Sequence, residues 1–69
     1  MYIVVTSDGE VYYVNDARTK IKVRGEQKWH PLHGSVKDGV NTICPKKIVP
    51  GQALSYANSL YTTIVRQVY

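Results

Sequence analysis

The chain has 69 residues, of which 43% are hydrophobic and 20% are charged. This length supports one hydrophobic core, so we expect a single domain over residues 1–69, and the charged fraction is too low for a self-repelling disordered chain. Nine Lys and Arg against five Asp and Glu give a net charge of +4, which favours an anionic partner, although an excess of this size also serves solubility alone.

Two β-branched and aromatic runs, residues 2–6 and 11–14, flank the dipeptide Asp8-Gly9. Asp-Gly between such runs predicts a hairpin, because a type I′ turn needs a positive φ at both central residues. We therefore expect a hairpin with a two-residue loop. In this register the core face of the hairpin holds Ile3, Val5, Tyr12 and Val14.

Residues 19–24 alternate cationic and apolar side chains and predict a third strand. A turn centred on Asp16-Ala17 pairs this strand with residues 11–14 and adds Ile21 and Val23 to the core face. The opposite face then gathers aromatic rings, cations and exposed apolar side chains, namely Tyr2, Val4, Thr6, Val11, Tyr13, Lys20, Lys22 and Arg24.

Prolines and glycines interrupt residues 25–51, where a second Asp-Gly hairpin over residues 36–43 fits the pattern. Helical spacing of Ala53, Ala57 and Leu60 predicts a short helix over residues 52–61. The β-branched residues 62–69 predict a final strand beside residues 2–6, with a continuation of the helix as the alternative. The expected fold class is α+β, a small antiparallel sheet of three to five strands with one short helix packed on one face.

The predicted face of rings and cations suggests a binding surface. Aromatic rings stack on bases and cations neutralise phosphates, so a sheet face that carries both is typical of nucleic-acid binding. The predicted partner-binding residues are Tyr2, Tyr13, Lys20, Lys22, Arg24, Lys28 and Trp29. Two structural explanations compete, because lysines that alternate along a strand also keep an edge soluble, and a lone Trp is commonly a core residue.

The predicted function is therefore that of a small basic protein that binds nucleic acid, either DNA or RNA. The alternative is a small protein-binding inhibitor or adaptor, of the type that phages and other mobile elements encode, which docks on an acidic surface of a host protein. A homodimer through the strand at residues 64–69 is compatible with both.

Patterns for catalysis and metal binding are weak. His30, His33 and Cys44 supply three ligands where structural zinc prefers four, and Pro31 separates the histidines, so we expect no metal and no cofactor. No acid and base pair and no glycine-rich phosphate motif stands out, so we expect no enzyme. The single cysteine, together with the lack of a recognisable signal peptide or membrane segment, favours a cytoplasmic location.

Overall fold

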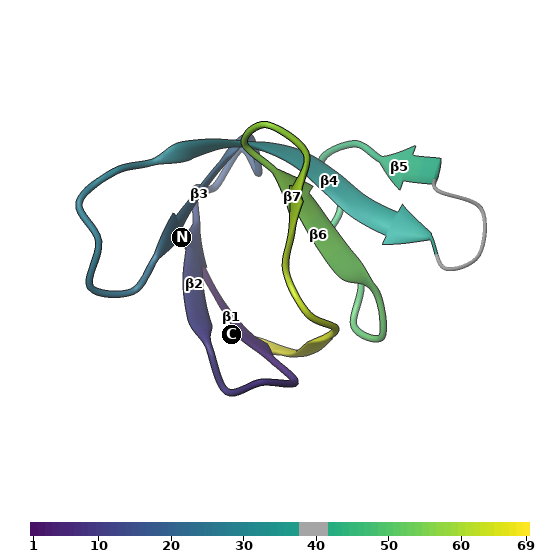
Figure 1. Ribbon diagram of the computed structural model, residues 1–69, viewed down its shortest axis with the longest axis horizontal. Coiled ribbons are helices and arrows are strands. Elements are labelled where there is room, and N and C mark those ends of the chain that lie inside the picture. The colour runs from purple at the N-terminus through teal and green to yellow at the C-terminus, as the bar shows by residue number, and fades with distance from the viewer. Residues whose placement is uncertain (38–41) are drawn as a thin grey trace.

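The computed structural model describes residues 1–37 and 42–69, and these residues form eight β-strands and no helix (Figure 1). The strands are β1 (Tyr2–Thr6), β2 (Val11–Val14), β3 (Lys20–Val23), β4 (His30–Lys37), β5 (Thr42–Cys44), β6 (Ala53–Tyr56), β7 (Leu60–Tyr61) and β8 (Val65–Val68). They form one antiparallel sheet in the order β7-β6-β4-β3-β2-β1-β8, and β5 pairs with β4. The expected α+β fold, with three to five strands and a helix, is therefore wrong.

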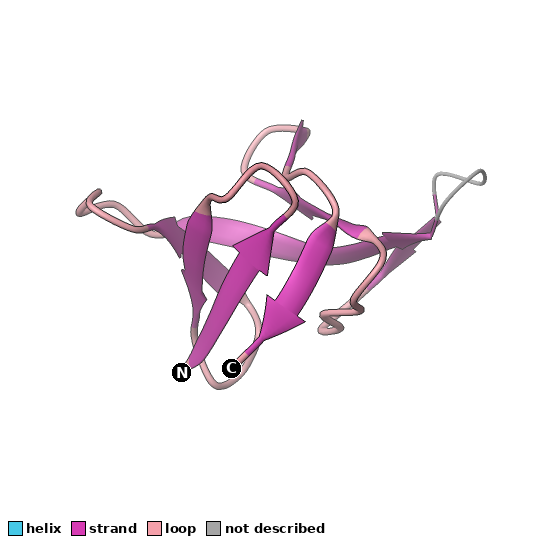
Figure 2. Cartoon of the chain, turned by 90° about the horizontal axis from the view of Figure 1, so that it is seen from below, coloured by secondary structure: helices cyan, strands magenta, loops and turns pink. Residues whose placement is uncertain are grey.

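The sheet curls until its two ends approach one another. Strand β8 pairs with β1, which confirms the predicted final strand beside residues 2–6, and Figure 2 shows these strands side by side with both termini at one end. On the other side of β8, the amide of Gly51 donates to the Val65 carbonyl at 2.8 Å and the amide of Val65 donates to the Gln52 carbonyl at 3.0 Å. These bonds protect part of an otherwise open edge. The homodimer expected through residues 64–69 stays a prediction.

Apolar side chains from six strands fill the inside of the curl. Because successive residues of a strand point to opposite faces, each strand contributes alternate residues to this core. Among the described residues, the buried apolar side chains are Val4, Tyr12, Val14, Ile21, Leu32, Leu54 and Val65. Full burial of such a side chain contributes roughly 1.5 to 3 kcal/mol, so this set is the main source of stability.

The segment expected to be a helix, residues 52–61, forms β6, a turn and β7 instead. Leu54 and Ser55 are the buried residues here, and they are adjacent in sequence, whereas Leu60 of the predicted helical stripe is 51% exposed. Ala57 has a φ of 51°, which breaks any helix and reverses the chain. The hydrogen bonds that a helix would have formed internally go to β4, which pairs with β6 along its length.

The first hairpin is confirmed, but its loop has three residues and not two. Val5 pairs with Val11, and the amide of Thr6 donates to the Glu10 carbonyl at 3.1 Å. Gly9 has a φ of 85°, whereas the residue before it has no positive φ, so the loop is not a type I′ turn.

This one-residue change of register turns β1 over relative to the prediction, because the side-chain period of a strand is two. Val4 lies in the core with no exposed surface, and Thr6 is buried beside it. Tyr2 is half-buried and packs against the same core. Ile3 and Val5, expected in the core, lie on the opposite side of the strand.

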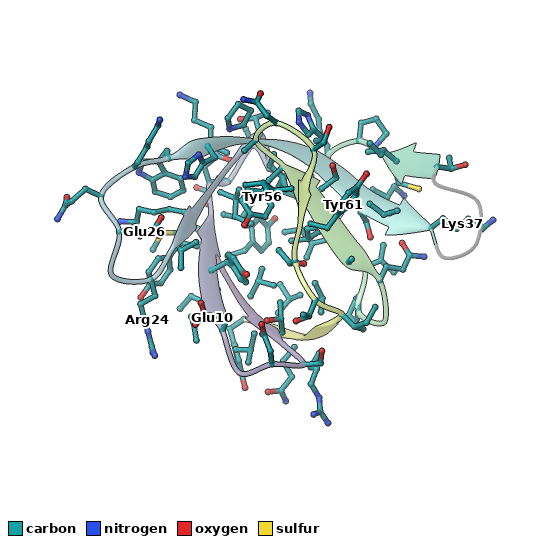
Figure 3. The ribbon with its side chains drawn as sticks, in the orientation of Figure 1. Glu10, Arg24, Glu26, Lys37, Tyr56 and Tyr61 are labelled. Atoms are coloured by element: carbon teal, nitrogen blue, oxygen red, sulfur yellow. The ribbon has the colours of Figure 1, made fainter. Side chains whose placement is uncertain are left out.

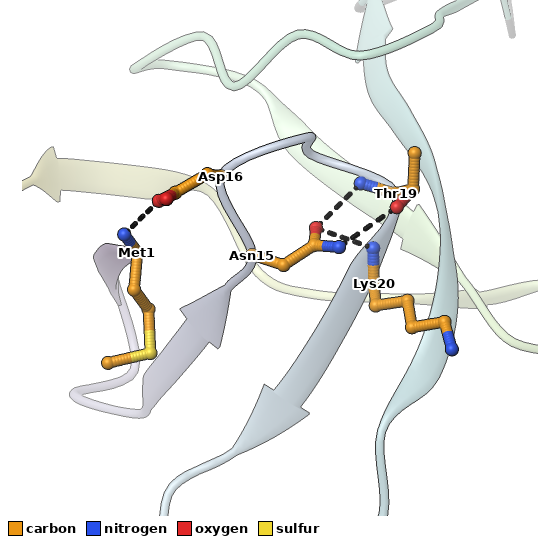
Figure 4. A network of polar contacts seen from close by, with 5 residues as sticks. All are labelled: Met1, Asn15, Asp16, Thr19 and Lys20. Carbon is orange, nitrogen blue, oxygen red and sulfur yellow. Dashed lines mark hydrogen bonds and ion pairs between the residues drawn. The ribbon is translucent and has the colours of Figure 1, made fainter.

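Asn15 closes the turn between β2 and β3 (Figure 4). Its Oδ1 accepts from the amides of Thr19 at 2.8 Å and Lys20 at 3.0 Å, and its Nδ2 donates to Thr19 Oγ1 at 2.9 Å. The amine of Met1 pairs with the Asp16 carboxylate in the same turn. The resulting register differs from the predicted one by two residues, so β2 and β3 keep the faces that the sequence predicts.

Strand β4 pairs with β3 and then with β5 along one edge, and with β6 along the other. Val36 pairs with Ile43, which confirms the arms of the second hairpin, while its Asp-Gly turn lies within residues 38–41, outside the described residues. Gly34 has a φ of 141°, and a Cβ there would lie 2.2 Å from the Cys44 carbonyl oxygen. Only glycine fits where β4 approaches the Cys44 carbonyl of β5 so closely.

Candidate nucleic-acid interface

The candidate interface is the convex side of β1, β2, β3 and β8, the side opposite the core, which we call the outer face. Its side chains alternate along each strand with those of the core. They are Ile3, Val5, Val11, Tyr13, Lys20, Lys22, Arg24, Gln67 and Tyr69, joined by Trp29 just before β4. Five of the seven residues predicted to bind the partner belong to this set: Tyr13, Lys20, Lys22, Arg24 and Trp29.

A single row of side chains crosses the middle of the outer face. Tyr13 pairs with Ile3 on one side and with Lys22 on the other. Ile3 exchanges two backbone hydrogen bonds with Tyr69, of 3.0 and 2.7 Å, and the register of β3 with β4 places Trp29 opposite Lys22. We call these five residues the aromatic row. Side chains directly opposite one another on neighbouring strands lie about 4.5 to 5.5 Å apart at Cβ, so the row is continuous.

Lys22 lies between two aromatic rings of this row. Its Nζ is 5.6 Å from the ring centre of Tyr13 and 5.3 Å from that of Trp29. An ammonium within about 6 Å of a ring centre is attracted by the negative ring face. Trp29 is 37% exposed, so it is neither a core residue nor a freely solvated one. Three of the residues predicted to bind the partner, Tyr13, Lys22 and Trp29, are therefore in contact with one another through the Lys22 ammonium.

Two further cations flank Lys22 along β3. Lys20 and Arg24 lie two residues before and after it, and both are exposed. Alternate residues of a strand share a face and lie roughly 6.7 Å apart. Arg24 is the first residue after β3, and its amide still donates to the Val11 carbonyl at 2.9 Å, so the three cations form a line along β3 and its continuation. Figure 3 shows Arg24 at the β3 end of the following loop, near Glu26 and far from Lys37 at the end of β4. Lys28 is exposed in the same loop.

Arg66 adds a cation that the sequence did not indicate. Val5 pairs with Gln67 and Thr6 pairs with Val65, so Arg66 is the extra residue of a β-bulge. It lines an open hollow at the β8 side of the outer face, together with Val5, Thr6, Ser7, Gly9 and Gln67. A bulge has no local sequence signature here, and Tyr69 was missed for a related reason, because its position depends on the register of β8 with β1.

Tyr2 does not belong to the outer face, which corrects its predicted place in the site. It is half-buried on the core side, and the guanidinium carbon of Arg18 lies 5.7 Å from its ring centre. Tyr2 is therefore held by Arg18 rather than presented beside Tyr13.

Acidic side chains near the outer face are held by the turns. Thr6 Oγ1 donates to Asp8 Oδ1 at 2.5 Å, and the amide of Glu10 donates to the same oxygen at 3.1 Å. The Thr6 hydroxyl, followed by the Glu10 amide, keeps the pKa of Asp8 below its ordinary value. Asp16 is paired with the Met1 amine. Asp8 and Asp16 are thus bound within the two hairpin turns and are not among the side chains of the outer face.

The histidines and the cysteine do not form a joint site. His30 packs edge-on against Tyr56, with ring centres 6.1 Å apart, and His33 Nε2 lies 2.6 Å from the Ala57 carbonyl oxygen. Cys44 is half-buried at the end of β5. Within residues 1–37 and 42–69, no three side chains of the metal-binding types come together.

Comparison with known proteins gives no assignment. No protein-family model, curated protein or solved structure matches the chain. In the part of the chain that the structure describes, no helix is long and apolar enough to cross a membrane.

Proposed function

We propose that this protein binds nucleic acid, DNA or RNA, through the outer face. The observation that supports this most directly is the contact of Lys22 with the rings of Tyr13 and Trp29 on an open sheet surface. Rings provide stacking surfaces for bases, and cations provide counter-charges for phosphates. Lys20 and Arg24 extend the positive charge on both sides of the cluster.

The composition of the outer face argues against a surface that serves solubility alone. Single exposed apolar side chains are normal on such a surface, whereas a contiguous group of them is not. Here Ile3 is 36% exposed, Trp29 37% and Tyr69 66%, and all three belong to one continuous row. An exposed apolar row beside a line of cations is typical of a binding site.

The strength of binding should depend on salt. If Lys20, Lys22, Arg24 and Lys28 each neutralise one phosphate, about four counterions are released. The slope of log affinity against log salt concentration is then roughly −3 to −4. A slope near zero would contradict the proposal.

The test is a titration of dye-labelled DNA and RNA oligonucleotides of mixed sequence, followed by fluorescence anisotropy at several salt concentrations. The double variant Lys20→Glu, Lys22→Glu should weaken binding and reduce the magnitude of the salt slope by about two. The matched control is Lys46→Glu, Lys47→Glu, which changes the net charge equally but in the exposed loop between β5 and β6. Equal effects of the two double variants would mean that the outer face is not the binding site.

A second candidate function is docking on an acidic protein surface as an inhibitor or adaptor. Val4 lies in the core and cannot contribute to it, but Ile3, Val5 and Val11 lie on the outer face. Apolar side chains with cations at the rim also suit a protein interface. This function predicts that a pull-down retains one dominant acidic protein and that no nucleic acid copurifies.

We further propose a cytoplasmic location, where nucleic acid is available. The chain contains one cysteine, Cys44, and its thiol is free. Small secreted domains usually rely on several disulfides, so a single free thiol supports a reducing compartment.

A further inference from the structure

We infer that the nucleic acid is single-stranded, with its backbone following β3 and its unpaired bases stacked on the aromatic row. This inference rests on the proposed function and specifies its ligand.

Two lines of side chains cross at Lys22. The cations Lys20, Lys22 and Arg24 run along β3, whereas the aromatic row runs across the strands. Residues two apart on a strand are separated by roughly 6.7 Å, which is comparable with the spacing of phosphates in an extended single strand. A backbone that follows the cations therefore has Tyr13 on one side and Trp29 on the other. Its bases can turn to either ring.

Stacking on these rings requires bases that are not already stacked on one another. A duplex presents base edges in its grooves and hides the base faces. Trp29 and Tyr69, which are 37% and 66% exposed, offer ring surface on which unpaired bases can stack and paired bases within a duplex cannot.

Lys22 links phosphate binding to base stacking. In the free protein its ammonium lies over the rings of Tyr13 and Trp29. A contact between an ammonium and a ring at an exposed site is weak, whereas an ammonium and a phosphate form a charge-assisted hydrogen bond. When a phosphate binds, Lys22 turns toward it and uncovers the ring faces. Phosphate binding thus prepares the site for the base.

The same geometry predicts a short footprint and little sequence preference. Three cations in line match three successive phosphates, or about four nucleotides. Every base has a face that can stack, so the choice of base changes affinity only modestly.

The intrinsic fluorescence of Trp29 provides a direct test, because it is the only Trp of the chain. The probes are octathymidylate, an abasic oligomer of equal length and charge, and a hairpin-closed duplex of similar charge. Octathymidylate should bind and quench Trp29. The abasic oligomer and the duplex should bind at least about tenfold more weakly, which corresponds to the loss of at least one stacked base, and should not quench Trp29.

The outcomes separate this inference from the function on which it rests. If the duplex binds as tightly as octathymidylate, or if Trp29 emission is unchanged at saturation, the single-strand inference is wrong and the proposed function stands. If none of the three probes binds at low salt, the proposed function is wrong as well.

A variant pair tests the role of Trp29 independently. Trp29→Leu should weaken binding of dye-labelled octathymidylate about tenfold and leave binding of the abasic oligomer unchanged. The control is Tyr61→Leu, which removes a ring that is 60% exposed on β7, away from the outer face, and should change neither. Equal loss for both oligomers in Trp29→Leu would show a structural role only. The comparison of probes on the unmodified protein does not depend on how this variant folds.

Discussion

Lys22 and Trp29 meet where β3 faces the beginning of β4, with Nζ 5.3 Å from the indole ring centre. Trp29 lies one residue before β4 begins at His30, so this contact connects the end of a long loop to the sheet. The contact lies on the surface, because both side chains are partly exposed to solvent, Trp29 to 37%. Its energy can therefore be measured without disturbing the core.

Replacing Lys22 with Met should cost about 0.5 to 1 kcal/mol of unfolding free energy, because the apolar stem is retained and only the ammonium over the rings is lost. Lys22→Arg should keep most of this energy. Urea unfolding followed by circular dichroism measures both. Lys20→Met, an exposed neighbour on β3, is the control and should change stability by less than about 0.5 kcal/mol. Equal losses at Lys20 and Lys22 would contradict the ring contact.

Val4 and Val5 test the register of the first hairpin. Val4 is fully buried and Val5 is half-buried on the outer face, whereas the sequence predicts the opposite. Val4→Ala should lower the unfolding free energy by about 2 kcal/mol, since it removes two buried methyl groups and leaves a cavity. Val5→Ala should cost less than about 1 kcal/mol. The reverse order, measured by urea unfolding, would support the register with a two-residue loop.

The sequence predicts several strands correctly because alternation along a strand is a local property. Residues 2–6, 11–14 and 20–23 are strands for this reason, and the composition of residues 62–69 predicts the last one. Register is different, because Asp8-Gly9 is compatible with loops of two or three residues. The longer loop is stabilised by the bonds of Asp8 Oδ1 to Thr6 and Glu10, a detail that hydrophobic patterning does not contain.

The same distinction separates the predicted from the missed parts of the site. Tyr13 and Lys22 are on neighbouring strands, β2 and β3. Their observed register differs from the predicted one by two residues, which leaves each side chain on the predicted face. The register of β1 with β2 differs from the predicted one by one residue, so Tyr2 lies on the opposite face from the one predicted. Residues 52–61 were misread because β6 receives its hydrogen bonds from β4, about twenty residues earlier, and a helical spacing of three small or apolar residues is weak evidence against such a partner.

Gly34 should be the least replaceable of the described glycines. A Cβ at this position would lie 2.2 Å from the Cys44 carbonyl oxygen, and φ is 141°. Gly34→Ala should cost more than about 3 kcal/mol, because it combines backbone strain with a contact that only movement of β5 can relieve. Gly25→Ala is the matched control, with a φ of 92° and no atom within 4 Å of the added Cβ, and should cost about 1 to 2 kcal/mol. Thermal unfolding measures the stability of both variants. Similar melting temperatures would contradict the close approach of Gly34 to the Cys44 carbonyl.

Tyr12 should make the fold sensitive to alkaline pH. It is 6% exposed in the core, edge-on to Tyr56 with ring centres 6.3 Å apart, and burial, followed by the charge of Tyr56, raises its pKa to about 12. In an unfolded chain the pKa is about 10. Because the folded value is the higher one, the protonated phenol stabilises the fold fully below pH of about 10, and this contribution is lost as the pH rises toward about 12.

The measurement compares the urea unfolding free energy of the unmodified protein and Tyr12→Phe at intervals between pH values of about 8 and 12. The phenylalanine variant lacks the ionising hydroxyl, so its stability relative to the unmodified protein should increase across this range. Tyr61→Phe, at a position that is 60% exposed, controls for titration of surface tyrosines and should show no such trend. A difference between the unmodified protein and Tyr12→Phe that stays constant with pH would mean that Tyr12 titrates as it does in the unfolded chain.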